Sequence, residues 1–154
     1  MGAYPHPVPR VRVENTVDVP REALFAVLSD HAGYDRFPGI TGSELIQPGT
    51  QERNGLGAVR RIRLGGPTVL DEEIVAYDAP NSFEYRITRA RPLPLNHTLG
   101  RVEFIAVDPN HTKVVWTSEF DIPVPIVGRS IGKYLEARLS RGFKAAIRAA
   151  AALA

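Results

Sequence analysis

The chain has 154 residues, of which 44% are hydrophobic and 23% charged, and its formal net charge is +2 at pH 7. These values are typical of one soluble globular domain with a proper core. The absence of cysteine excludes disulfides and thiolate chemistry, and no apolar stretch approaches the ~20 residues of a membrane span. We therefore expect a cytoplasmic protein without a transmembrane segment.

Residues 1–10 (MGAYPHPVPR) predict a short extended arm, because three prolines fall within the first nine residues. This segment lacks the apolar core of a signal peptide. The remainder, 11–154, is predicted to form a single domain, since no internal repeat or linker interrupts it.

The predicted elements begin with a strand over 11–19 and a short helix over 21–28, whose entrance Asp18 and Pro20 mark. A second helical turn over 32–37 ends at Pro38-Gly39. Segments rich in β-branched and aromatic residues follow, separated by turn residues, and they predict strands at 40–47, 56–64, 68–77, 82–90, 97–108 and 112–121. Because the turns between them are short, successive strands are expected to be antiparallel.

Residues 126–154 predict one long helix, after Pro123 and Pro125 have ended the last strand. Its apolar face consists of Ile131, Leu135, Leu139, Phe143 and Ala146, and its basic face of Arg129, Lys133, Arg141, Lys144 and Arg148. No aromatic residues interleave with the basic face, which argues against nucleic-acid binding.

Three glycines fall on the apolar face of this helix: Gly128, Gly132 and Gly142. Each costs about 1 kcal/mol relative to alanine inside a helix, so a compensating reason is expected. Either the sheet packs very close to the helix there, or the missing side chains leave space for a ligand.

A seven-stranded antiparallel sheet must bury one face, and only the terminal helix is long enough to cover it. The expected fold is therefore α+β, a helix-grip fold in which the sheet wraps around the long C-terminal helix and two short helices follow the first strand. In order and spacing, four segments resemble the START/Bet v 1-like superfamily, in its polyketide cyclase/dehydrase-type branch of SRPBCC proteins: VDVPREALFAVLSDHAGYDRFPG, GLGAVRRI, EEIVAYDAPNSFEYRI and TKVVWTSEF. The resemblance implies a deep apolar cavity between sheet and helix. It does not imply one chemistry, because such proteins include lipid carriers, hormone binders and polyketide aromatases.

Strand alternation predicts which side chains point toward this cavity, although each could equally be a core residue. The predicted lining is Ile62, Leu70, Phe83, Tyr85, Ile87, Val102, Phe104, Val114, Trp116, Ser118 and Phe120 from the strands, with Ile131, Leu135, Leu139 and Phe143 from the helix. Thr98 and Ala106 are also expected to point inward, and Thr117 outward. The predicted cavity rim comprises His31, Tyr34, Arg89 and His97.

A hairpin centred on Gly66 pairs Ile62 with Leu70 and Arg60 with Glu72. If the first pair faces inward, the second does too, so we predict an inward or rim Arg60–Glu72 ion pair. The pair is either structural or a polar anchor for a ligand. Tyr85 and Trp116, if buried, each need a hydrogen-bond partner.

The sequence supports no metal site and no cofactor, since the histidines are scattered and no metal, nucleophile-elbow or dinucleotide motif occurs. We predict a carrier or sensor of an apolar small molecule such as a lipid, fatty acid or polyketide-like compound. The alternative is a polyketide cyclase, aromatase or dehydrase, a lyase-type enzyme with Arg60, Glu72 and Tyr85 as catalytic candidates. A third reading is a partner-binding module that uses the basic helix face. Ligand identity and oligomeric state do not follow from the sequence.

Overall fold

The computed structural model describes residues 10–154, so the predicted arm lies outside the described residues except for its last residue. The elements follow the predicted order: β1 (Arg10–Val17), α1 (Arg21–Leu28), the 3-10 helix η1 (His31–Arg36), β2 (Gly42–Gln47), β3 (Val59–Arg63), β4 (Val69–Asp78), β5 (Ser82–Arg91), β6 (Asn96–Asp108), β7 (His111–Asp121) and α2 (Gly128–Leu153). Within this part of the chain, no helix combines the length and the apolar character needed to span a membrane.

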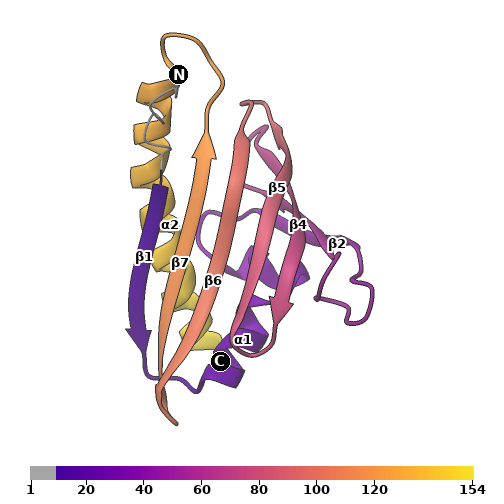
Figure 1. The fold of residues 1–154 in the computed structure, drawn as a ribbon, viewed down its shortest axis with the longest axis vertical. Helices are drawn as coiled ribbons and strands as arrows, with labels where there is room; N and C mark the ends of the chain where they lie inside the picture. The colour runs from indigo at the N-terminus through magenta and orange to yellow at the C-terminus, as the bar shows by residue number, and fades with distance from the viewer. Residues whose placement is uncertain (1–9) are drawn as a thin grey trace, which may run out of the picture.

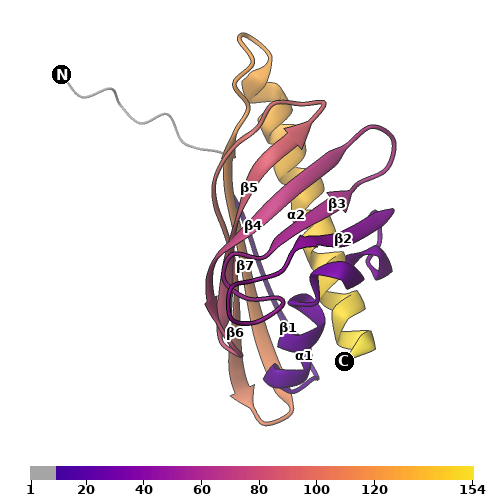
Figure 2. The ribbon, with the colours of Figure 1, turned by 90° about the vertical axis from the view of Figure 1, so that its right-hand side faces the viewer.

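The strands form one seven-stranded antiparallel sheet in the order β1-β7-β6-β5-β4-β3-β2. From β2 to β7 each strand is the neighbour of the next, through short connections except for residues 48–58 between β2 and β3, and β1 adds to the free edge of β7. Figures 1 and 2 show α1 and α2 on the same side of the curved sheet, with α2 running along β1 and β7. The predicted helix-grip fold is confirmed.

Helix α1 fills one end of the space beneath the sheet. Leu24, Phe25 and Leu28 are spaced to share one helix face, and all three are buried. The ring of Phe25 meets the edges of Phe83 and Phe104, with ring centroids 6.1 Å and 5.1 Å away. Aromatic packing of this kind closes that end of the fold, so any open space must lie elsewhere along α2.

The glycines of α2 have two different explanations. A Cβ atom on Gly128 would lie 2.5 Å from the carbonyl oxygen of Ile122, so the backbones approach too closely for any side chain. A Cβ atom on Gly142 would meet nothing within 4 Å. Close packing therefore accounts for the first glycine and open space for the second. Gly132 is buried, and the five residues of the basic face are all exposed.

Two register shifts overturn some of the predicted side-chain directions. A shift between His97 and Leu99 turns His97 inward and leaves Thr98 exposed. A second shift, between Asp71 and Glu72, places Arg89 opposite Asp71 on the outer face of the sheet, where its side chain is exposed. Each irregularity inserts an extra residue into one strand, which reverses the alternation beyond it. Arg89 is therefore not at a cavity rim.

Two further directions differ from expectation. Ala106 is exposed, because it lies near the end of β6, where no helix covers the sheet. Thr117 has the outward position that alternation predicts, but it is buried there. Its neighbours across the sheet are Arg12 and Arg101, whose long side chains cover it.

Candidate functional site

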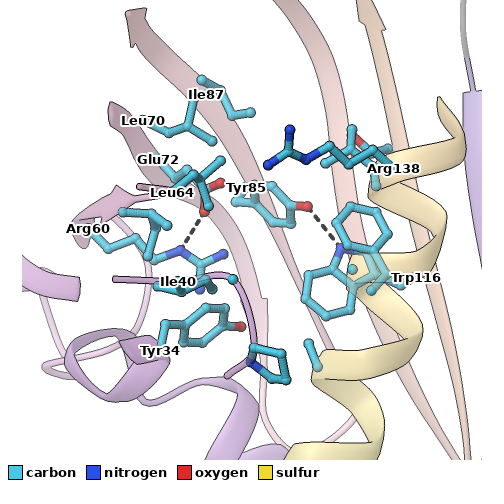
Figure 3. Close-up of a pocket in the computed structure, with 18 residues that line it drawn as sticks. Tyr34, Ile40, Arg60, Leu64, Leu70, Glu72, Tyr85, Ile87, Trp116 and Arg138 are labelled. Carbon is cyan, nitrogen blue, oxygen red and sulfur yellow. Dashed lines mark hydrogen bonds and ion pairs between the residues drawn. The ribbon is translucent and has the colours of Figure 1, made fainter. Parts of the chain in front are cut away.

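A cavity of about 190 Å³ lies between the sheet and α2. Its apolar wall is contributed by the segment after η1, by three strand residues, by Leu64 just after β3 and by α2: Pro38, Gly39, Ile40, Ile62, Leu64, Leu70, Ile87, Leu139, Gly142, Phe143 and Ala146. Its polar or partly polar lining residues are Tyr34, Arg60, Glu72, Tyr85, Trp116, Ser118 and Arg138. Figure 3 shows these side chains converging from opposite sides, with Arg138 extending from α2 over the cavity.

The structure divides the predicted lining into two groups. Those that line the cavity are Ile62, Leu70, Tyr85, Ile87, Trp116, Ser118, Leu139 and Phe143. The others are buried in or packed against the core: Phe83, Val102, Phe104, Val114, Phe120, Ile131 and Leu135. Alternation identifies the inner face of a strand but not how far along that face the cavity extends.

Some lining residues were not predicted from the sequence, namely the segment 38–40, Leu64 and Arg138. The first follows a helical turn and has no strand periodicity to interpret. Arg138 lies one helical turn before Gly142, whose missing side chain leaves room beside it. The i, i+4 spacing places Arg138 and Gly142 on the same helix face, and this was the feature of the sequence that could have indicated a cation at the cavity.

Arg60 and Glu72 form the predicted ion pair on the cavity wall. The β3–β4 register pairs Arg60 with Glu72 and Ile62 with Leu70, and the Arg60 Nε donates to Glu72 Oε2 at 2.5 Å. The two residues are 1% and 7% exposed. Burial, the largest single effect, lowers the pKa of Arg60, but the Glu72 carboxylate together with Tyr34 and Tyr85 outweighs it and raises the pKa above its ordinary value. The cavity therefore contains a permanently charged but paired guanidinium.

Two aromatic rings and one imidazole complete the surroundings of Arg60. The guanidinium carbon lies 4.3 Å from the ring centroid of Tyr34 and 5.2 Å from that of Tyr85. Tyr34 is buried and donates its hydroxyl proton to the Leu28 carbonyl oxygen at 2.6 Å. This side chain, predicted at the rim, therefore forms part of the wall.

The sequence predicted His31 at the rim of the cavity, but the structure places it behind Arg60, where it is fully buried. Arg60 Nη1 lies 3.2 Å from its Nδ1, and its Nε2 lies 2.8 Å from the carbonyl oxygen of Asn54. A guanidinium can only donate and a carbonyl can only accept, so Nδ1 is the acceptor and Nε2 carries the proton. Burial, reinforced by the charge of Arg60, lowers the pKa of His31 to about 3.

His97 is likewise buried, and it stands behind the cavity wall instead of at its rim. The backbone N–H of Ile87 donates to His97 Nδ1 at 3.0 Å, and Nε2 lies 3.1 Å from the hydroxyl oxygen of Ser118. Its ring stacks on Tyr85, with centroids 5.5 Å apart. Burial, with a smaller contribution from Arg86, lowers the pKa of His97 to about 4.

Tyr85 and Trp116 are each other's hydrogen-bond partners. The indole Nε1 of Trp116 donates to the Tyr85 hydroxyl oxygen at 2.9 Å, and burial raises the pKa of Tyr85. The Trp116 ring also stacks on Phe143 of α2, with centroids 4.3 Å apart and planes 7° from parallel. These contacts connect the sheet to the helix across the cavity. Within residues 10–154 no group of histidine and carboxylate side chains is arranged to hold a metal ion.

Residues 8–154 match the family model described as "Polyketide cyclase / dehydrase and lipid transport". The chain belongs to this family. The match confirms the resemblance found in the sequence. A comparison with curated proteins gave no match.

Several solved structures share this fold. An aromatase/cyclase, Zhui from Streptomyces sp. R1128, has a TM-score of 0.78 and 22% identity over 93% of this chain and 91% of that one. A START superfamily protein from Mycobacterium smegmatis has a TM-score of 0.75 and 16% identity over 94% and 99%. Norcoclaurine synthase from Thalictrum flavum, solved with dopamine and hydroxybenzaldehyde, has a TM-score of 0.67 and 17% identity over 94% and 84%. At these identities the likeness shows the fold.

Proposed function

We propose that this protein binds a small apolar molecule in the cavity between sheet and α2, as a carrier or sensor. The observation that carries the proposal is a largely apolar cavity with a few convergent polar groups, the usual composition of a small-molecule site. The family, whose description includes lipid transport, favours the same reading.

The volume of the cavity limits the size of the ligand that it can enclose. A dry apolar cavity of ~150 Å³ holds one benzene molecule, and the cavity here has about 190 Å³. Its buried part therefore suits one substituted ring or a short chain. A longer lipid or polyketide-like chain would have to extend past Ile40 and Arg138 toward solvent.

Native mass spectrometry of the purified protein, followed by extraction of any bound molecule, tests this proposal directly. Trp116 gives a second readout, because it is the single tryptophan of the chain and lines the cavity. A retained or added apolar compound should change its fluorescence. If no compound from an aromatic and fatty-acid library bound or raised the melting temperature, the proposal would be wrong.

A cyclase or dehydrase acting in the same cavity is the second candidate. Its supporting observation is that Arg60, Glu72 and Tyr85 all line one cavity. The enol form of a polyketone substrate would attack, through its carbon, a second carbonyl of the same molecule that the Tyr85 hydroxyl polarises. The enol proton would pass to the new alkoxide, and the resulting hydroxyl would leave as water with a hydrogen of the neighbouring carbon. Glu72 would have to release Arg60 in order to accept the methylene proton, which disfavours it as the base. Heptane-2,4,6-trione tests this candidate, because its terminal methyl carbon can attack the carbonyl at the other end and close a six-membered ring. The expected product is 5-methylresorcinol, formed above the uncatalysed rate and separated by chromatography from the pyranone of equal mass.

The basic face of α2 remains a prediction as a partner-binding surface. All five of its residues are exposed. Salt-sensitive association that persists when the cavity is blocked would support that role.

A further inference from the structure

Two hydroxyl groups on the cavity wall, those of Tyr85 and Ser118, accept hydrogen bonds from the protein but have no acceptor for their own protons among residues 10–154. Both residues line the cavity and both are buried. The direction of each hydrogen bond decides whether the hydroxyl proton remains available to a ligand. For both residues the chemistry of the bonding partner determines that direction.

The direction at Ser118 follows from the tautomer of His97. Because the Ile87 N–H donates to Nδ1 of His97, that nitrogen carries a lone pair, and the proton of the neutral ring resides on Nε2. Nε2–H therefore donates to the Ser118 oxygen, 3.1 Å away. Ser118 is the acceptor in this bond, and no residue from 10 to 154 receives its hydroxyl proton.

The direction at Tyr85 is fixed by Trp116, because an indole N–H can only donate. The Trp116 Nε1–H donates to the Tyr85 oxygen at 2.9 Å. The phenolic proton has no acceptor among the described residues, and burial raises the pKa of Tyr85, so the proton stays on the oxygen at neutral pH.

The two hydroxyl-bearing residues lie in one row across the sheet. Tyr85 pairs with Gly100 on β6, and Gly100 pairs with Ser118 on β7. A Cβ atom on Gly100 would collide with the Tyr85 ring, so the ring lies across the bare glycine toward β7. Figure 3 shows the Tyr85 hydroxyl reaching across to Trp116. The sheet thus brings both free protons to the β7 side of the cavity.

We propose that the ligand carries a neutral carbonyl-type oxygen that accepts the hydroxyl protons of Tyr85 and Ser118. This inference rests on the proposed function and names the chemical class of its ligand. A pure hydrocarbon would leave two buried donors without partners, which disfavours its binding. A carboxylate fits less well between these two hydroxyls, because Arg60 is already neutralised by Glu72 and the other cation of the lining, Arg138, is exposed, so a charge paired with it would lie toward solvent.

Acetophenone and ethylbenzene test the proposal, because they differ mainly in a carbonyl against a methylene group and each has one ring. Dissociation constants would be measured by NMR titration of the parent protein, Tyr85→Phe and Ser118→Ala. Each variant should weaken acetophenone binding about 3- to 10-fold, the value of one hydrogen bond. Ethylbenzene binding should be unchanged or tighter, because the variant no longer leaves that donor without a partner. The matched controls are Tyr77→Phe and Thr117→Val, which remove a hydroxyl from a residue that does not line the cavity.

A measurement on the parent protein alone avoids any effect of substitution on folding. The carbonyl stretching band of bound acetophenone should lie at lower wavenumber than in hexane, because hydrogen bonding weakens the C=O bond. An unshifted band, or variants that weaken both ligands equally, would overturn the assignment of the two hydroxyls while leaving a binding cavity. Failure of the parent protein to bind either compound, or any other apolar compound, would overturn the proposed function as well.

Discussion

Arg60 Nη1 lies 3.2 Å from His31 Nδ1, so a neutral imidazole stands directly behind a buried guanidinium. The two residues come from η1 and β3, 29 positions apart in the chain. Because a protonated His31 would face the Arg60 charge without water between them, the imidazole must stay neutral for this arrangement to persist. The cavity wall is therefore sensitive to acid through a residue that does not itself line the cavity.

The free energy of unfolding should fall with decreasing pH over the range in which His31 is protonated in the unfolded protein but neutral in the folded protein. Its pKa is about 3 in the folded protein, against an ordinary value of 6.5. Between these values the unfolded state binds the extra proton, so stability decreases with acid, by about 1.4 kcal/mol per pH unit at most from this residue. Urea unfolding from pH 7 to pH 4 would show the slope. His31→Gln, which keeps an acceptor for Arg60, should reduce the slope without abolishing it, because the lowered pKa of His97, about 4, adds its own contribution. An unchanged slope would contradict the assignment to His31.

Removing either member of the Arg60–Glu72 pair should be costly, whereas removing both should cost less. A single change such as Glu72→Leu leaves an uncompensated buried charge, at about 3–5 kcal/mol. The double variant Arg60→Met with Glu72→Leu replaces the pair by apolar groups and should recover much of that loss. Unfolding free energies measure both effects. The control is Glu14→Gln in the Arg12–Glu14 pair, whose side chains are 50% and 42% exposed, so that water screens the pair and its loss should be smaller.

The double variant also separates the two roles predicted for the pair. A structural pair should be replaceable without loss of ligand binding, whereas an anchor should not. Titration of the folded double variant with acetophenone distinguishes them: affinity equal to the parent's would mean that the pair acts only through the fold.

The register of the β3–β4 hairpin was predictable because one turn, at Gly66, and strict alternation decide it. Arg60 and Glu72 follow from that register alone. The positions of His97 and Arg89 were not predictable, because each depends on a register shift that the residue types in the sequence do not indicate. The cavity boundary was also out of reach, since it depends on where Phe25 of α1 fills the inner face, a contact between distant segments.

Gly100→Ala should destabilise the protein and disturb the Tyr85–Trp116 contact. The added methyl group would collide with the Tyr85 ring, which lies directly over Gly100. A displacement of the ring would lengthen the 2.9 Å hydrogen bond to Trp116 and move one of the two free hydroxyl protons. Thermal unfolding and the near-ultraviolet circular dichroism of Trp116 report the two effects. A melting temperature and spectrum like the parent's would show that the ring has room to move.

Alanine at Gly142 should raise the stability of the protein, in contrast to alanine at Gly100. A larger side chain at Gly142 should block the cavity. Gly142→Ala adds a methyl group that meets nothing within 4 Å and replaces a poor helix former, so it should stabilise the protein by about 1 kcal/mol. Gly142→Leu should also remain folded, but its side chain would occupy the space beside Phe143. We expect Gly142→Ala to retain acetophenone binding and Gly142→Leu to lose it at least 10-fold, measured by the Trp116 fluorescence change. If Gly142→Leu bound acetophenone as tightly as Gly142→Ala, the ligand would have to lie outside this cavity. If Gly142→Leu lost both binding and folding, the helix would have to pack more closely on the sheet than the open space beside Gly142 implies.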